Sequence, residues 1–224
     1  MQENNLLPTP QEATTLGGEG SPAPITQQDI SEVYQSVMQS LLSSVSQNED
    51  LTSSFHKIFT IAVSPQLFDG DDVKSLPNTP TQCLQLHIPE GGSQPNIPAM
   101  INELRTPSRV ENGDQATFAK FDSFPAVLAL HVMRYRFAQQ LGSKITTRVI
   151  APFQLELEDF PDKYSLHASL NHVGDSCNNG HYIAVVHGKD QVWRRFDDTK
   201  VSVLSDEDAC QLIEDGFMLI YVKD

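Results

Sequence analysis

Hydrophobic residues recur at helical spacing in the first patterned stretch of the chain, which follows Asp29. The spacing i, i+3, i+4, i+7 is that of one helix face, and Asp29 with Glu32 three residues later imitates a capping box. A helix is therefore predicted to begin at Asp29. We expect its stripe to face the core, with a docking helix as the alternative. The stripe consists of Ile30, Val33, Tyr34, Val37, Met38, Leu41, Leu42 and Val45.

The remainder of the chain reads as short helices followed by many strands. Further helices are predicted over 49–60, 97–104 and from Ser205 through Ile213, and the Pro, Asp and Gly content of 61–82 indicates loops. Helices first and then mostly antiparallel strands predict an α+β fold. The expected strands are 84–88, 126–137, 145–157, 164–172, 181–187, 191–197 and 217–222.

Two of these strands carry the most informative polar residues. The stretches 181–187 and 191–196 are rich in β-branched and aromatic residues and flank the turn signal Gly188-Lys189-Asp190. A hairpin centred on Lys189 places His181 directly opposite Asp197 and on the same face. Cβ atoms of such cross-strand pairs are about 4.5–5.5 Å apart.

A carboxylate at that distance can hold an imidazole in one tautomer and stabilise its protonated form. Asp198 falls on the other face, and a register slip of one residue would exchange the two aspartates. His/Asp pairs also occur as plain polar partners on exposed sheets. Spacing alone therefore leaves a catalytic and a structural role open for His181 and Asp197.

Composition narrows the class of protein. A chain of 224 residues with net charge -14 and three cysteines fits an intracellular globular protein, cytoplasmic or nuclear, without a disulfide framework. The acidic balance argues against nucleic acid and anionic membranes as partners, and no apolar run approaches 18 residues. Residues 1–24 are rich in Pro, Gly, Thr and Glu and are predicted to be disordered, which leaves 25–224 as the folded domain.

Several motifs together resemble the ubiquitin-specific proteases, cysteine proteases that cut the isopeptide bond after the ubiquitin C-terminus. The histidine box is the specific part, and Gln27-Gln28-Asp29 before a helix is similar to the Q-Q-D box of that family. Further stretches agree in order. The matching runs are Tyr164 to Gly174, Gly180-His181-Tyr182, Trp193 to Val201, Pro125 to Tyr135 and Gly216 to Tyr221.

The resemblance implies a papain-like fold of the ubiquitin-specific protease type, with the palm, reduced fingers with antiparallel sheet and the thumb largely missing. It implies that His181 is the general base, oriented by Asp197 or Asp198. Ubiquitin or a ubiquitinated protein is the implied partner. The implied substrate-binding residues are Gly180, Tyr182, Arg134, Tyr135 and His172. His172 is expected to orient the loop before His181, and a surface ion pair is the alternative for Arg134.

The nucleophile half of the family pattern is absent. The family carries its cysteine in an N-x-G-N-x-C box well before the Q-Q-D box, whereas only 26 residues precede Gln27 here and none is a cysteine. The oxyanion asparagine is missing with that box. Cys177 lies in a loop without a helix dipole to lower its pKa, and Cys83 and Cys210 are expected to be packing residues.

The cysteine spacing also bears on metals. The chain has no pair of cysteines at zinc-ligand spacing and its histidines are dispersed, so we expect no structural zinc and no cofactor.

Three interpretations follow from the sequence. In the first, residues 25–224 are part of a deubiquitinating cysteine protease whose thumb, with the nucleophile, lies in a missing N-terminal segment. In the second, the chain is a catalytically dead pseudo-protease that still binds ubiquitin or another partner. In the third, it is a structural domain without either role. In each case we expect this chain alone not to hydrolyse ubiquitin conjugates.

Overall fold

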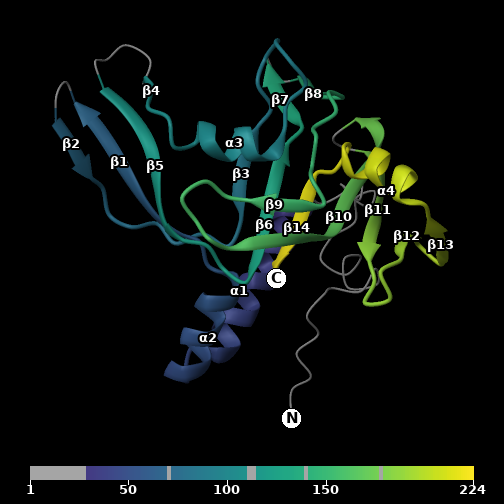
Figure 1. The fold of residues 1–224 in the computed structure, drawn as a ribbon, viewed down its shortest axis with the longest axis horizontal. Coiled ribbons are helices and arrows are strands. Elements are labelled where there is room, and N and C mark those ends of the chain that lie inside the picture. Colours follow the sequence, from purple (N-terminus) through teal and green to yellow (C-terminus); the bar gives the residue numbers. More distant parts are fainter. Residues whose placement is uncertain (1–28, 70–71, 110–114, 139–140, 177–178) are drawn as a thin grey trace, which may run out of the picture.

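A large, mostly antiparallel sheet forms the centre of the computed structural model, which describes residues 29–69, 72–109, 115–138, 141–176 and 179–224 (Figure 1). Only the pair β3–β6 is parallel, and the short β9 (Gln154–Glu156) pairs with β10 off the main path. The strand order is β13 (Lys200–Leu204), β12 (Trp193–Asp197), β11 (Asn179–His187), β10 (Lys163–Ser176), β14 (Met218–Lys223), β6 (Val127–Met133) and β3 (Leu84–His87). The predicted α+β class is confirmed.

A second sheet projects from the first (Figure 1) and corrects the prediction of loops over 61–82. Its order is β2 (Asp72–Ser75), β1 (Ala62–Asp69), β5 (Gln115–Ser123) and β4 (Ser108–Arg109). The Pro and Asp residues that indicated loops are tolerated because β1 pairs with β5 along its length, a tertiary contact that outweighs local preference. A separate hairpin joins β7 (Tyr135–Ala138) to β8 (Leu141–Lys144).

The helices begin where their caps predict. Asp29 caps α1 (Ile30–Val45) by accepting from the Ser31 backbone N–H at 2.7 Å, and Ser205 caps α4 (Asp206–Ile213) by accepting from the Asp208 N–H at 3.1 Å. The predicted helices 49–60 and 97–104 are α2 (Glu49–Phe59) and α3 (Ile97–Glu103). Among the described residues, no helix is both long and apolar enough to cross a membrane.

The apolar stripe of α1 does not face the core as predicted. Met38 is its one buried residue, while the side chains of Val37 and Leu41 are 44% and 42% exposed. Helix α1 packs on α2 (Figure 1), and Val37 and Leu41 of the stripe remain exposed. The stripe is an apolar helix face that this chain leaves partly open.

The predicted strand over 145–157 is also corrected, because the backbone there bonds to several different neighbours. Val149 N–H donates to the Glu214 carbonyl at 3.0 Å, and Ile150 forms an isolated bridge with Asn96. Only the three residues of β9 continue a sheet. The predicted disordered segment 1–24, and with it Gln27, Gln28 and Cys177, lies outside the described residues.

The buried side chain of Arg134 links residues 145–147 to residues 214–216 by hydrogen bonds. Arg134 follows β6 and is 2% exposed. Its guanidinium donates to the carbonyls of Gly216 (2.8 Å), Thr147 (2.7 Å) and Glu214 (2.6 Å), with a longer contact to Ile145 at 3.4 Å. Burial lowers its pKa to about 10, so it stays charged at neutral pH. From the sequence, Arg134 was expected in a substrate cleft or in a surface ion pair. Instead it is buried, and its guanidinium N–H groups donate to backbone carbonyls of this chain.

Candidate active site

His181 and Asp197 meet at the end of the β11–β12 hairpin. His181 Nε2 and Asp197 Oδ1 are 2.7 Å apart, so the predicted contact is confirmed. The predicted register is wrong by two residues, since Ala184 pairs with Phe196 and His187 with Trp193. His181 and Asp197 are therefore diagonal rather than direct neighbours, and they still share a face because side chains alternate with a period of two.

The turn explains the two-residue shift. The hairpin closes between Gly188 and Val192, with Gly188 N–H donating to the Val192 carbonyl at 3.0 Å. The loop thus contains three residues, and the third, Gln191, has φ 59°. A type I turn followed by a left-handed residue is a common three-residue hairpin loop. The sequence signal Gly188-Lys189-Asp190 marked the turn and missed its last residue.

Asp198 lies at the edge of the same cluster. Its Oδ2 is 4.0 Å from His181 Nε2, and its side chain is 79% exposed. The second oxygen of Asp197 accepts from Arg195, which leaves its first oxygen for His181. The hydrogen bond with His181, aided by the charge of Arg195, holds the pKa of Asp197 below its usual range. Asp197 is therefore the better oriented carboxylate of the two.

Gly180 leaves room for a neighbouring imidazole. A Cβ at this position would lie 2.2 Å from His172 Nε2 and 2.6 Å from the Val173 carbonyl oxygen. His172 therefore packs directly on the backbone that precedes His181. The family resemblance implied that Gly180 binds substrate. The residue is exposed, and its first steric role is to admit His172.

His172 is held from several sides. Its Nδ1 is 3.1 Å from the Tyr135 hydroxyl, and its ring meets Tyr182 edge-on at 5.0 Å between centroids. Lys144 donates to the His172 carbonyl at 2.8 Å. Burial, together with the charge of Lys144, lowers the pKa of His172, which keeps the ring neutral. The structure thus brings Tyr135, His172, Gly180 and Tyr182 together beside His181 and leaves Arg134 apart as a buried residue.

The N-terminus of α1 also reaches this region, which sequence reasoning missed. Burial raises the pKa of Tyr182 and the charge of Asp29 adds to it, whereas a hydrogen bond from the Ile30 backbone opposes it. Asp29 also acts electrostatically on His172 and His131. The Q-Q-D box was the available signal, but in the sequence it served only as a family motif and not to place Asp29 beside His172 and Tyr182.

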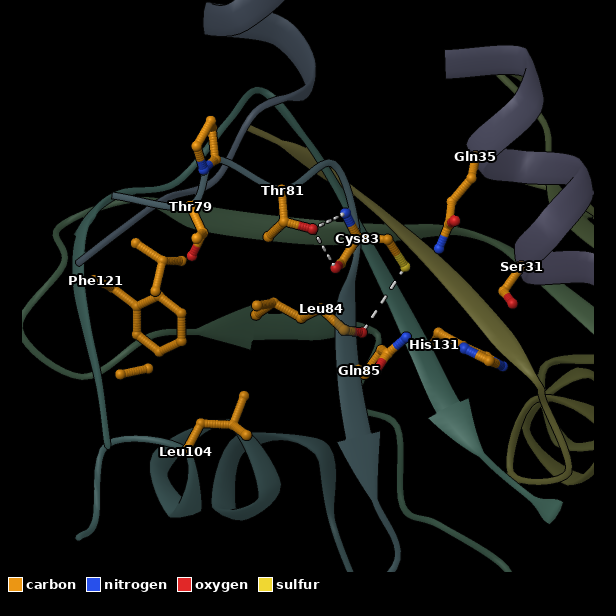
Figure 2. A pocket seen from close by; sticks show the side chains of 13 residues that line it. Ser31, Gln35, Thr79, Thr81, Cys83, Leu84, Gln85, Leu104, Phe121 and His131 are labelled. Atoms are coloured by element: carbon orange, nitrogen blue, oxygen red, sulfur yellow. Dashed lines mark hydrogen bonds between the residues drawn. The ribbon is translucent and has the colours of Figure 1, made fainter. Parts of the chain in front are cut away.

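A thiol and a second imidazole line a separate cavity of about 420 Å³ between α1 and β3. Figure 2 shows Cys83 and His131 in this cavity, facing Ser31 and Gln35 of α1. Burial raises the pKa of the Cys83 thiol to about 12. His131 is 6% exposed, its Nδ1 has no hydrogen-bond partner among the described residues, and burial lowers its pKa.

These environments do not suit a nucleophilic cysteine, because the reactive form is the thiolate. The pKa of Cys210, on α4, is also raised by burial. Cys177 lies outside the described residues. Among the described residues, His181, Asp197 and Asp198 are the only three His, Cys, Asp or Glu side chains whose ligand atoms gather within 4.8 Å.

Comparison with known proteins identifies the family of the chain. The family model for ubiquitin carboxyl-terminal hydrolase matches residues 6–221. Ubiquitin carboxyl-terminal hydrolase 4 of Arabidopsis thaliana is 32% identical over 115 residues, which cover 43% of this chain and 31% of that protein. The probable ubiquitin carboxyl-terminal hydrolase creB of Aspergillus flavus is 36% identical over 92 residues, 37% of this chain and 12% of that protein.

Solved structures share the fold. The SAGA Ubp8/Sgf11/Sus1/Sgf73 DUB module bound to ubiquitin aldehyde contains a chain that matches with a TM-score of 0.75 and 19% identity. The match covers 89% of this chain and 50% of that one. The Ubp8-Sgf11-Sgf73-Sus1 SAGA DUB module gives a TM-score of 0.76 at 20% identity, over 89% and 49% of the two chains. This chain thus spans about half or less of the length of these relatives and solved chains.

Proposed function

Because the chain belongs to the ubiquitin carboxyl-terminal hydrolase family, we propose that it supplies the histidine and carboxylate half of a cysteine protease that removes ubiquitin from proteins. The supporting observation is the 2.7 Å contact between His181 Nε2 and Asp197 Oδ1. Asp197 orients the ring and stabilises the imidazolium that forms when the ring takes up a proton. Asp198 remains a second, more exposed carboxylate.

The contact also assigns the two ring nitrogens of His181. A carboxylate only accepts hydrogen bonds, so in the neutral ring Nε2 carries the proton and donates it to Asp197. Nδ1 then has the free lone pair and serves as the base. It would take the proton of a thiol nucleophile and later pass it to the leaving amine of the isopeptide.

The nucleophile in this proposal comes from another segment. The pKa values of Cys83 and Cys210 are raised, which keeps both thiols protonated, and Cys83 lines a cavity with a different imidazole. A nucleophilic cysteine requires a lowered pKa and a fixed oxyanion site. A thumb segment that carries cysteine and asparagine would supply both. The partly open stripe of α1, with Val37 and Leu41, is a surface on which it could pack.

The proposed substrate is the C-terminal tail of ubiquitin on a target protein. Gly180 is exposed, so an extended peptide can approach its backbone from the side that His172 does not occupy. Tyr135 is hydrogen-bonded to His172, and the His172 ring meets the Tyr182 ring edge-on beside this segment. In this proposal His172 and Tyr135 position the Gly180–His181 backbone, and Gly180 and Tyr182 meet the tail.

The test measures ubiquitin binding and turnover separately. The purified chain is mixed with ubiquitin and with a fluorogenic ubiquitin substrate, first alone and then with a folded thumb segment from a family relative that carries the cysteine box. We expect weak binding and no turnover alone, and turnover after addition. His181→Ala should abolish that turnover, whereas the exposed His167→Ala should not change it. Turnover by the chain alone that is lost in Cys177→Ala would instead make Cys177 the nucleophile.

A binding-only role is the second candidate, and the raised pKa values of the two described cysteine thiols favour it. In that case the chain would bind ubiquitin as a pseudo-protease. Ubiquitin binding without turnover, although both pieces are folded and associate, would support this role over the first.

A further inference from the structure

The cluster of His181, Asp197 and Asp198 offers three metal-ligand atoms from two neighbouring segments. Its ligand atoms lie within 4.8 Å of one another, and His181 Nε2 is 2.7 Å and 4.0 Å from the two carboxylates. Around an ion with Zn–N and Zn–O bonds of about 2.0–2.2 Å, tetrahedral ligands lie about 3.4 Å apart. The 2.7 Å separation would widen and the 4.0 Å separation would shorten, each by less than about 1 Å, while the two aspartate oxygens would have to close from at most 4.8 Å.

The side chains can make this adjustment. Asp198 is 79% exposed, so its carboxylate can swing toward the ring without disturbing the core. His181 and Asp197 are 40% and 29% exposed, which leaves the cluster open to ions from solution. Arg195 pairs with the far oxygen of Asp197 and offsets part of the negative charge. Three protein ligands with an open position for water is a coordination that zinc adopts.

We propose that His181, Asp197 and Asp198 also form an exchangeable site for Zn²⁺ that switches the tautomer of His181. The imidazole selects Zn²⁺ over Mg²⁺ and Ca²⁺, which prefer oxygen ligands alone. Such an ion exchanges with solution and is distinct from the structural zinc whose absence the cysteine spacing predicts.

The switch follows from counting protons on the ring. Without metal, Nε2 carries the single proton of the neutral imidazole and donates it to Asp197. A zinc ion that binds the Nε2 lone pair requires that proton to leave Nε2, and the neutral ring then carries it on Nδ1, with solvent as the carrier. Nδ1 no longer has a lone pair. If His181 is the base of the proposed protease, bound Zn²⁺ therefore inhibits it reversibly; this last step rests on the proposed function.

The experiment reads the tautomer directly. The chain is labelled with ¹⁵N-histidine, treated with EDTA, and titrated with ZnCl₂ while long-range ¹H–¹⁵N spectra are recorded. We expect the His181 signals to change from an Nε2–H ring to an Nδ1–H ring with a metal-bound Nε2, and EDTA to reverse the change. CaCl₂ should produce no change. Zinc binding that leaves His181 as the Nε2–H tautomer would overturn the proposal.

Variants test the ligand set by calorimetry. His181→Ala should lose the binding, and Asp197→Asn and Asp198→Asn should each weaken it. The matched controls are the exposed His167→Ala and Asp190→Asn, a hairpin aspartate paired with Arg194 at 2.6 Å, and both should bind as the unmodified chain does. Binding retained in His181→Ala, or unchanged in both aspartate variants, would overturn the site. Absence of any zinc binding would do the same.

If a variant fails to fold, the tautomer spectra of the unmodified chain still decide the question. The two proposals also fail separately. Zinc binding is measured on the chain without turnover, so a chain that has no part in deubiquitination can still show the tautomer switch. If zinc does not change the turnover of the reconstituted protease, zinc inhibition at His181 is contradicted and the protease assignment still stands.

Discussion

Two imidazoles in this protein, those of His181 and His131, lie in opposite environments. His181 sits at an accessible hairpin end, bonded to Asp197 through one nitrogen. His131 is buried and lines one cavity with the Cys83 thiol, and in the part of the chain that the structure describes its Nδ1 has no hydrogen-bond partner. By residue type alone, the His131–Cys83 pair looks more like a cysteine-protease dyad than His181 with its two aspartates.

The environments reverse that impression. Burial lowers the pKa of His131 and raises that of Cys83 to about 12, so both stay neutral and neither is activated. At His181 a carboxylate fixes the tautomer, and the ring remains open to a partner from outside. Orientation by a charged group combined with access is what marks a catalytic imidazole. Proximity of thiol and imidazole is not sufficient.

The strongest test of the different roles of His181 and His131 is to replace each with glutamine in the reconstituted protease. His181→Gln should lower kcat by about 10⁴–10⁶-fold because the base is lost. His131→Gln should change it by less than about tenfold, since that ring touches no reacting group in the proposal. Initial rates on a fluorogenic ubiquitin substrate measure both. A larger loss for His131→Gln in a folded variant would place the chemistry in the cavity.

The two aspartates are compared next. Asp197→Asn should reduce kcat by about 10²–10⁴-fold, because the amide can present a donor to Nε2 and favour the wrong tautomer. Asp198→Asn should have a much smaller effect, since Asp198 is 4.0 Å away and mostly exposed. The same rate assay applies, with circular dichroism as the folding control. Equal losses for both variants would mean that the aspartates share the orienting role.

Gly180→Ala tests how tightly His172 supports the site. The new methyl group would lie 2.2 Å from His172 Nε2, so one of the two must move, at a cost of about 1–3 kcal/mol in unfolding free energy. The His172 and His181 NMR signals should both shift. Gly92→Ala is the control for the NMR signals only: no atom lies within 4 Å of its Cβ, so it should leave those signals in place, although its φ of 89° strains the new alanine. Unshifted signals in Gly180→Ala would show that His172 does not pack there.

The smallest expected effect is on how the free energy of unfolding depends on pH. The pKa values of His131 and His172 are lowered in the folded state, so the unfolded chain binds more protons below about pH 6.5. The free energy of unfolding should therefore fall as the pH drops from 7 through the range between the ordinary and the lowered pKa. Urea titrations at pH 7 and 5.5 measure this. His131→Met should reduce the loss, and an unchanged slope would contradict the neutral, buried state of His131.

Local signals in the sequence predicted local structure well. Asp29 and Ser205 marked helix starts because capping needs only neighbouring backbone. The His181–Asp197 contact survived an error of two residues in register, because an even shift keeps both side chains on one face. Family motifs then linked this contact to a histidine box, which spacing alone could not do.

Contacts between segments far apart in the chain could not be predicted from the sequence. The strands β1 and β5 exist because they pair with each other across about fifty residues, and the Pro and Asp content of β1 pointed the other way. The apolar stripe of α1 looked like a core face, but periodicity reports only that a face is apolar and not what covers it. The register of β11–β12 depended on Gln191 adopting a left-handed backbone, which non-glycine residues do infrequently.

The hydrogen bonds of Arg134 should determine how the protein unfolds locally. Its guanidinium links carbonyls at 145–147 with those at 214 and 216, two stretches about seventy residues apart. Any local opening that separates them leaves a buried cation and several carbonyls without partners, each costing about 1–3 kcal/mol. Amides around this corner, such as Val149, which donates to the Glu214 carbonyl, should therefore exchange with solvent as one cooperative unit. Arg134 thus couples residues 145–147 to residues 214–216. The backbone amides of both stretches are expected to exchange with solvent at the same rate-limiting opening.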